Sequence, residues 1–287
     1  MGKMKRRIFL LAFVGCVLLV FVFLLVRGDV FSLKREKIGV LEIKGVIESS
    51  EEVLKELKAF EEDYAIKAVL LRIDSPGGSV GASQEIWKEV LRIREKKPVV
   101  ASLGNVAASG AYYVACAANK ILANPGTLTG SIGVVMYFTD LEELMRKIGI
   151  KTHVIKSGSY KDTGSPFRGL TPQEKELLQG LLNEVHEQFV KAVSQSRNLP
   201  IEKVKEIADG RLLSGEEAFR LKLVDELGGF EDALRVAKEL GGIKGEPELV
   251  YPKRKVSLLR LLLEGFGKGS LEDFLPRRWG FYYIFEF

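Results

Sequence analysis

Apolar and polar residues follow one another in short runs that are typical of a protein built from both strands and helices. Residues 68–74, Ala-Val-Leu-Leu-Arg-Ile-Asp, predict a buried parallel strand. A glycine-rich turn follows at residues 75–78, and Ile86, Trp87, Val90 and Leu91 then recur at helical spacing. The order of strand, turn and helix returns at residues 99–118. Two such units side by side predict a parallel sheet covered by helices.

The rest of the pattern predicts further elements of both kinds. Short apolar runs bounded by turn residues predict strands over 38–46, 120–123, 134–138 and 152–156, and the run 99–103 ends at a predicted Gly104-Asn105 turn. Apolar positions at helical spacing predict helices over 51–60 and 140–148. The capping box Thr171-Pro-Gln-Glu174 begins a long helix that should pack through one face up to Val193. Short helices broken by glycines are expected over 199–240.

The N-terminal segment predicts a membrane anchor. Residues 8–26 carry no charge, and as a helix they are roughly 28 Å long against about 30 Å of bilayer hydrocarbon. Basic residues precede the run, so the N-terminus is expected in the cytoplasm and the rest of the chain on the other side. A cleaved signal peptide is the alternative, but the run is longer than the 7 to 15 residues usual in secretory signals.

Composition excludes several kinds of site. The chain has 287 residues and a net charge of +5, yet no basic helix interleaved with aromatic residues, so no nucleic-acid partner is expected. Residues 126–133 are glycine-rich but lack the ending of a phosphate-binding loop. Two cysteines and two histidines give neither a disulfide framework nor a metal-ligand spacing, so no metal and no cofactor are expected.

Ser109 is the first candidate for chemistry, because it stands where a strand turns into a helix. Backbone N–H groups at a helix start favour negative charge, which suits a nucleophile, although a serine there is also a common helix cap. His153 and His186 show no pattern of an orienting carboxylate, so a Ser-His-Asp triad is not predicted. A lysine base remains, and it must be neutral, which at pH 7 costs about 4.6 kcal/mol from a reference pKa near 10.4. Lys161 is the candidate because its loop is rich in glycine, provided that Asp162 points away.

Four motifs resemble those of the signal peptide peptidase A family of membrane-anchored serine proteases, in the same order and at about the same spacing. They are Ser75-Pro-Gly-Gly78, Ala107-Ala-Ser-Gly110, Thr129-Gly-Ser-Ile-Gly133 and Gly158-Ser-Tyr-Lys-Asp162. The similarity covers roughly residues 38–240. It implies an α/β, ClpP/crotonase-like fold of repeated ββα units with an N-terminal transmembrane helix. The chain departs from the family at Lys222, where glycine is usual.

The resemblance also implies roles for individual residues. Ser109 is the expected nucleophile and Lys161 the expected general base, with Ser131 positioning the lysine. Backbone N–H groups at Gly77, Gly78 and Gly110 are the expected oxyanion hole. Assembly into a ring of identical subunits is implied as well.

Together these observations predict a membrane-anchored serine endopeptidase that cleaves short apolar peptides such as remnant signal peptides. Its expected location is the cell membrane, crossed once, with the catalytic domain outside the cytoplasm. The expected parts are a cytoplasmic segment, the anchor, a linker, the protease domain and a tail, over 1–7, 8–26, 27–37, 38–250 and 251–287. Two alternatives stay open: a crotonase-like acyl-CoA enzyme, and a non-catalytic membrane scaffold.

Overall fold

A mostly parallel sheet forms the centre of the molecule. The computed structural model describes residues 36–252 and 282–284, together with Phe13, Gly15 and Leu18. The main path of the sheet runs β7-β6-β4-β2-β1-β9, and β5 and β8 extend it from β4. Its strands are β1 (Lys37–Lys44), β2 (Ile66–Ser75), β4 (Val99–Ala108), β5 (Lys120–Ala123), β6 (Leu128–Gly130), β7 (Leu212–Ser214), β8 (Glu226–Leu227) and β9 (Glu248–Val250). The β6–β7 pair is antiparallel, and the other pairs of this sheet are parallel.

Both faces of this sheet are buried. Successive side chains of a strand point to opposite sides, so neighbouring residues belong to different clusters. Val40 of β1 and Leu70 of β2 belong to a cluster with α9 (Phe230–Leu240) on one face. Their sequence neighbours Leu41 and Leu71 belong to a larger cluster on the other face. This two-sided burial explains why residues 68–71 of β2 are a continuous apolar run in the sequence.

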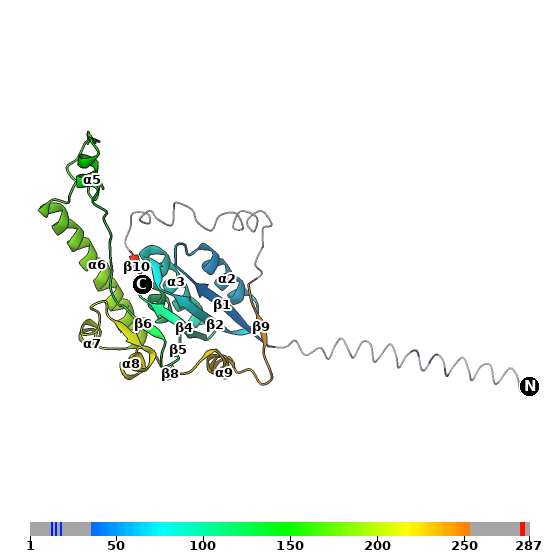
Figure 1. Cartoon of the computed structure of the whole chain (residues 1–287). Helices are drawn as coiled ribbons and strands as arrows, with labels where there is room; N and C mark the ends of the chain where they lie inside the picture. Colours follow the sequence, from blue (N-terminus) through cyan, green and yellow to red (C-terminus); the bar gives the residue numbers. More distant parts are fainter. Residues whose placement is uncertain (1–12, 14, 16–17, 19–35, 253–281, 285–287) are drawn as a thin grey trace, which may run out of the picture.

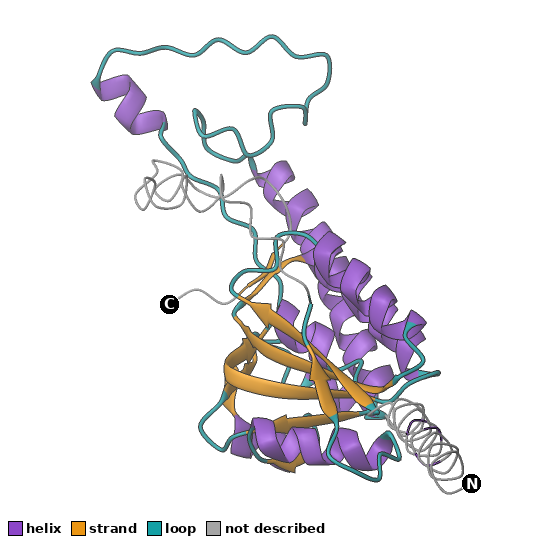
Figure 2. Cartoon of the chain, turned by 90° about the vertical axis from the view of Figure 1, so that its right-hand side faces the viewer, coloured by secondary structure: helices purple, strands orange, loops and turns teal. Residues whose placement is uncertain are grey.

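Helices cover the larger cluster and surround the sheet (Figures 1 and 2). They are α2 (Glu51–Glu62), α3 (Val80–Arg94), α4 (Gly110–Ala115), α6 (Pro172–Arg197), α7 (Ile201–Lys205) and α8 (Gly215–Arg220). The predicted capping box at the start of α6 is confirmed: the Thr171 hydroxyl accepts from the Glu174 N–H, and the Glu174 carboxylate accepts from the Thr171 N–H. The turn at Lys222 has φ +62°, so it keeps the left-handed backbone that a glycine would adopt more easily.

Residues 136–182, called the arm below, project from the body (Figure 1). The arm carries the short helix α5 (Glu142–Lys147) and the first half of α6. The predicted strands over 134–138 and 152–156 are wrong: the first makes a single bridge at Val135, and the second has no strand partner. Apolar residues there have no neighbouring strand to pair with, and the Ile155 side chain is fully exposed.

Two further predictions of the sequence need correction. The β4 strand does not end at Gly104-Asn105 but continues to Ala108, because the Asp74 carboxylate accepts hydrogen bonds from the Asn105 side chain and the Val106 N–H. The α6 helix does not pack along its whole length. Phe189 and Val193 are buried, whereas Leu181 in the projecting half is 39% exposed.

The mixed α/β class and the parallel-rich sheet are confirmed, and they fit the ClpP-like fold implied by the resemblance. Within the part of the chain that the structure describes, no helix is long and apolar enough to cross a membrane. The predicted anchor over 8–26 lies outside the described residues apart from Phe13, Gly15 and Leu18, and the tail beyond Pro252 does so apart from 282–284.

Candidate active site

Ser109 lies at a strained turn between β4 and α4. Its backbone angles, φ 55° and ψ −120°, fall in a region that residues other than glycine rarely adopt. The Ser109 N–H donates to the Gly130 carbonyl oxygen at 2.8 Å, and the residue is 1% exposed. A nucleophilic serine on a strained strand-to-helix turn is the arrangement used by several hydrolases. The strain therefore marks Ser109 as a candidate catalytic residue.

The glycines of β3 (Gly77–Ser79) have little free space around them. A Cβ atom on Gly78 would lie 2.2 Å from the Ile47 carbonyl oxygen, and one on Gly77 would lie 2.7 Å from the Gly110 nitrogen. Gly77 has φ +103°, and its N–H donates to the Ser75 hydroxyl at 3.1 Å. Since Ile47 bonds to the Gly77 carbonyl and the Ser79 N–H, the N–H of Gly78 points to the other side of the strand.

Ser131 is brought beside Ser109 by the pairing of β4 with β6. Ala108 and Gly130 are partners in that ladder, so the two serines follow directly on neighbouring strands. Ser131 is 6% exposed and has φ 49°, and its N–H donates to the Arg211 carbonyl oxygen at 2.8 Å. The structure thus gathers Ser109, Ser131 and the three predicted oxyanion-hole glycines in one place.

Lys161 lies elsewhere in this chain. It belongs to the arm, in the loop before α6, and its side chain is exposed. Its backbone N–H donates to the Gly158 carbonyl oxygen at 3.1 Å. Within the described residues, no hydrogen bond or ion pair joins the Lys161 amine to Ser109 or Ser131. The structure of a single chain therefore does not bring the two members of the predicted dyad together.

Asp162 is paired with two other cations of the arm, Lys156 and Arg168. Its carboxylate receives hydrogen bonds from Arg168 at 2.8 Å and from Lys156 at 2.5 Å, and these hold the pKa of Asp162 well below its usual range. Arg168 also bonds to Glu174, at 2.5 Å, and lowers the pKa of that carboxyl in the same way. The sequence pattern indicated Glu174 only as a helix cap and gave no signal for Arg168.

A short strand that the sequence analysis did not predict crosses this region. The strand β10 (Tyr282–Ile284) pairs antiparallel with β3, and Tyr283 faces Gly78 in that register. The aromatic composition of residues 279–287 was the available signal, but nothing in it indicates where the segment binds. The region around Ser109 thus accommodates an extended peptide.

The described residues offer few other reactive groups near Ser109. Cys116 is the nearest thiol along the chain, and burial raises its pKa to about 12, so it stays protonated at neutral pH. No group of three or more His, Cys, Asp or Glu side chains able to hold a metal ion is found in the described part of the chain. The arrangement is suited to nucleophilic attack by a serine hydroxyl.

Comparison with known proteins identifies the family. Residues 92–244 match the model of peptidase family S49. A putative protease of Synechocystis is 49% identical over 211 residues, which is 73% of this chain and 76% of that protein. The chain belongs to peptidase family S49. The chain is therefore a serine peptidase. Family membership supports neither of the two alternatives, an acyl-CoA enzyme or a scaffold without activity.

Other S49 relatives carry more specific names. The chloroplastic serine protease SPPA of Arabidopsis thaliana is 38% identical over 243 residues, covering 84% of this chain and 36% of that protein. A putative signal peptide peptidase SppA of Enterococcus faecium is 39% identical over 187 residues, covering 65% of this chain and 54% of that protein. The SppA type of S49 peptidase is therefore the group that this chain resembles, as its four motifs predicted.

Proposed function

We propose that this S49 peptidase is a membrane-anchored endopeptidase that uses Ser109 and Lys161 to cleave short apolar peptides, such as remnant signal peptides. The observation that carries the proposal is the strained turn at Ser109, packed against the glycines of β3. Backbone strain persists only where the surrounding structure enforces it, and it is concentrated at functional sites.

The proposed reaction is an acyl transfer to serine. Lys161 takes the proton of the Ser109 hydroxyl as its oxygen attacks the peptide carbonyl carbon, and the same proton is then given to the leaving amine. The N–H groups of Gly78 and Gly110 stabilise the oxyanion. The Gly77 N–H is engaged with Ser75, so Gly77 supplies the backbone turn instead. Ser131 holds the lysine amine, and water finally releases the acyl group.

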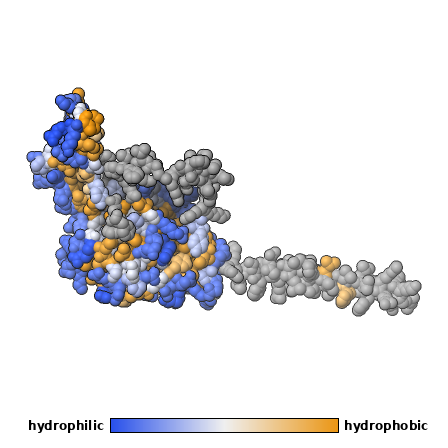
Figure 3. Space-filling model, viewed as in Figure 1, coloured by the Kyte–Doolittle hydropathy of each residue, from blue (hydrophilic) through white to orange (hydrophobic). Residues whose placement is uncertain are grey.

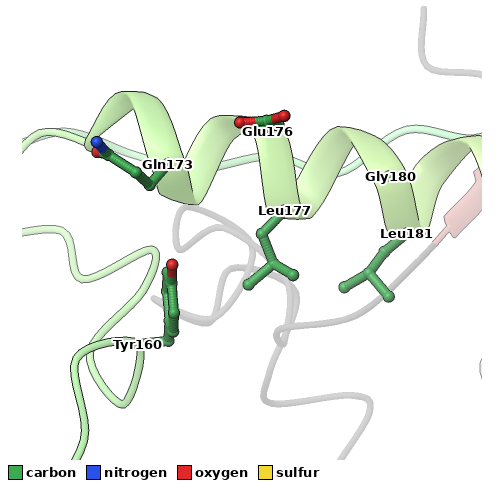
Figure 4. Close-up of a pocket in the computed structure, with 6 residues that line it drawn as sticks. All are labelled: Tyr160, Gln173, Glu176, Leu177, Gly180 and Leu181. Atoms are coloured by element: carbon green, nitrogen blue, oxygen red, sulfur yellow. The ribbon is translucent and has the colours of Figure 1, made fainter.

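The dyad requires a second copy of the chain. A lysine acts as a base only where burial disfavours its charged form, and Lys161 is exposed in the single chain, so it needs a surface that shields it from water. The arm exposes apolar residues that suit such a contact (Figure 3), among them Leu144, Ile148, Ile155 and Phe167. Figure 4 shows a hollow with Tyr160 on one side and Leu177 and Leu181 of α6 on the other. A neighbouring surface can fill it. A ring of identical subunits would shield every arm in this way.

The site and the N-terminal run support the proposed substrate class. A groove that holds an extended strand between two backbones admits an unfolded peptide but not a folded protein. The uncharged residues 8–26 would hold the chain in the cell membrane, where apolar peptides collect, with the catalytic domain outside the cytoplasm. Relatives named signal peptide peptidase support the same substrate class.

The proposal is tested by peptide hydrolysis with the full-length protein in lipid vesicles. We expect Ser109→Ala to lower the rate of cleavage of an apolar fluorogenic peptide by at least about 10,000-fold. Lys161→Ala should cause a loss of similar size, whereas the control Lys151→Ala, an exposed lysine of the same arm, should leave the rate unchanged. Equal rates for Ser109→Ala and the unmodified protein would contradict the assignment.

A further inference from the structure

The strand β4 contains a bulge just before the turn at Ser109. Its ladder with β2 is regular up to Leu103 and resumes at Ala107. Between these two pairs Asp74 alone stands opposite residues 104–106, so β4 has two residues more than a regular ladder would have. Without them Ser109 would lie roughly 6.6 Å further along the sheet, at about 3.3 Å per residue. The bulge therefore determines where β4 places Ser109, and bulges beside active sites commonly redirect a side chain in this way.

The side chain of Asp74 holds this bulge in place. Its carboxylate accepts hydrogen bonds from the Val106 N–H at 3.1 Å and from the Asn105 side chain at 3.2 Å. The glycine at position 104 leaves room for the carboxylate, because a Cβ atom on Gly104 would lie 2.8 Å from the Asp74 carboxyl carbon. The buried Thr127 hydroxyl, just before β6, donates to the Gly104 carbonyl oxygen at 2.7 Å. The bulge is thus bonded to groups outside β4.

The backbone of Asp74 is joined to the segment that supports β3. The Asp74 carbonyl oxygen accepts from the Gly45 N–H at 3.1 Å. Two residues later, the Ile47 N–H donates to the Gly77 carbonyl oxygen, and the Ile47 carbonyl oxygen accepts from the Ser79 N–H, both at 2.8 Å. Asp74 is therefore bonded through its side chain to the strand that leads to the candidate nucleophile, and through its backbone to the segment beside the proposed oxyanion hole.

We infer that Asp74 is a positioning residue that sets the place of the Ser109 hydroxyl relative to the N–H groups of Gly78 and Gly110. This inference rests on the proposed function. Acyl transfer depends on such placement, because the donors must lie about 2.7 to 3.1 Å from the position that the oxyanion takes. A displacement of about 1 Å can cost about 100-fold in rate. Asp74 acts through the backbone of β4 and not by contact with the substrate.

Asp74→Asn in the full-length protein tests the placement without emptying the bulge. The amide keeps the size of the side chain and can accept from the Val106 N–H, but its NH₂ group cannot accept from Asn105. We expect kcat for an apolar fluorogenic peptide to fall roughly 10-fold per active site, with KM changed less than about 2-fold. Active sites are counted by complete reaction with a serine-reactive phosphonate. Adding Asn105→Asp restores a donor and an acceptor across the bulge and should recover most of the lost kcat. Full kcat in Asp74→Asn, or no recovery in the double variant, overturns the inference.

The control Asp63→Asn separates placement from folding. The Asp63 carboxylate also accepts from a backbone N–H, that of Ala65 at 2.9 Å, but it lies before the start of β2, whereas Asp74 lies near its end. Both variants should lower the melting temperature by roughly 2 to 4 °C, and only Asp74→Asn should lower kcat per active site. Equal losses of kcat in the two variants overturn the inference, because Asp74 would then only stabilise the fold. If the unmodified protein neither cuts an apolar peptide nor reacts with the phosphonate at Ser109, the proposed function itself fails.

Discussion

At the scale of single residues, space and backbone angle explain why the site needs the residues that it has. Ser109 and Ser131, which directly follow neighbouring strands, both have positive φ. Gly77 of β3 also has positive φ. Such angles cost of order 1–3 kcal/mol each in residues other than glycine. Two strained serines side by side are therefore held in place by their surroundings, which fits the proposed roles as nucleophile and positioning residue.

A glycine pair in one short segment gives a matched test of the oxyanion hole. A Cβ atom on Gly78 would lie 2.2 Å from the Ile47 carbonyl oxygen, whereas one on Gly81 would meet nothing within 4 Å. We expect Gly78→Ala to displace the β3 backbone and lower kcat about 100- to 1000-fold. The control Gly81→Ala, on α3, should keep kcat and raise stability by about 0.5 to 1 kcal/mol. Similar kcat values for the two variants would show that the Gly78 N–H is not used.

Arg168 gives a test of the lysine base that does not alter the lysine. Its guanidinium neutralises Asp162, the residue after Lys161. In Arg168→Gln, the Asp162 carboxylate would favour the protonated form of the base and raise its pKa. The midpoint of the pH–rate profile should therefore move upward, by roughly half to one pH unit. The control Arg146→Gln removes an exposed arginine that pairs with Glu143, and its midpoint should not change. An unmoved midpoint in Arg168→Gln would mean that Asp162 does not act on the base.

At the scale of elements, the sequence predicted what local pattern determines and missed what distant segments determine. The buried run of β2 and the capping box of α6 follow from neighbouring residues, and both were predicted. The strand over 152–156 was not found, because an alternating pattern needs a partner strand and the arm offers none. The continuation of β4 past Gly104 depends on Asp74, some 30 residues earlier.

Only part of the candidate site was predicted from the residue pattern itself. Ser109 was found because a strand turns into a helix there, whereas the roles of Ser131 and the glycines of β3 came from the resemblance of their motifs. The structure brings these residues together because turns after neighbouring parallel strands meet at one edge of a sheet. Arg168 and the aromatic cluster around Tyr283 were missed. The cluster combines Trp87, Tyr113 and Phe189 from three separate helices with Tyr283, which lies far from all three in the sequence. No local pattern encodes such a contact.

The capping box at the start of α6 follows the loop that carries Lys161, and its removal is a test at this scale. The Thr171 hydroxyl accepts from the Glu174 N–H, and the Glu174 carboxylate accepts from the Thr171 N–H and from Arg168. We expect Thr171→Ala to cost about 1 kcal/mol and to speed hydrogen exchange in the first turn of α6. The control Lys175→Ala, exposed one residue after Glu174, should stay within about 0.5 kcal/mol. Unchanged exchange in Thr171→Ala would show that the cap does not hold this turn.

At the scale of the whole molecule, the arm separates Lys161 from the rest of the candidate site (Figure 1). The body holds the strained serine, the glycines and the bound strand β10, while the arm holds an exposed lysine and exposed apolar side chains. A single chain therefore keeps the proposed nucleophile apart from the proposed base. Assembly supplies the base if the arm of one copy reaches the body of the next.

Mixing two inactive variants tests this arrangement. Ser109→Ala keeps the lysine and Lys161→Ala keeps the serine, so a head-to-tail ring of both contains sites with one of each. Random assembly of equal amounts should recover about a quarter of the activity of the unmodified protein, because each site needs two independent choices. Each variant assembled alone should stay inactive. A mixture without activity would place both members of the dyad in one chain.

The most direct measurement is the distance between the Ser109 Oγ and the Lys161 Nζ in an experimental structure of the assembled, full-length protein. The account predicts about 2.6 to 3.2 Å between a serine of one copy and a lysine of its neighbour, with the amine shielded from water. A lysine amine that points into solvent in every copy of the assembly would contradict it.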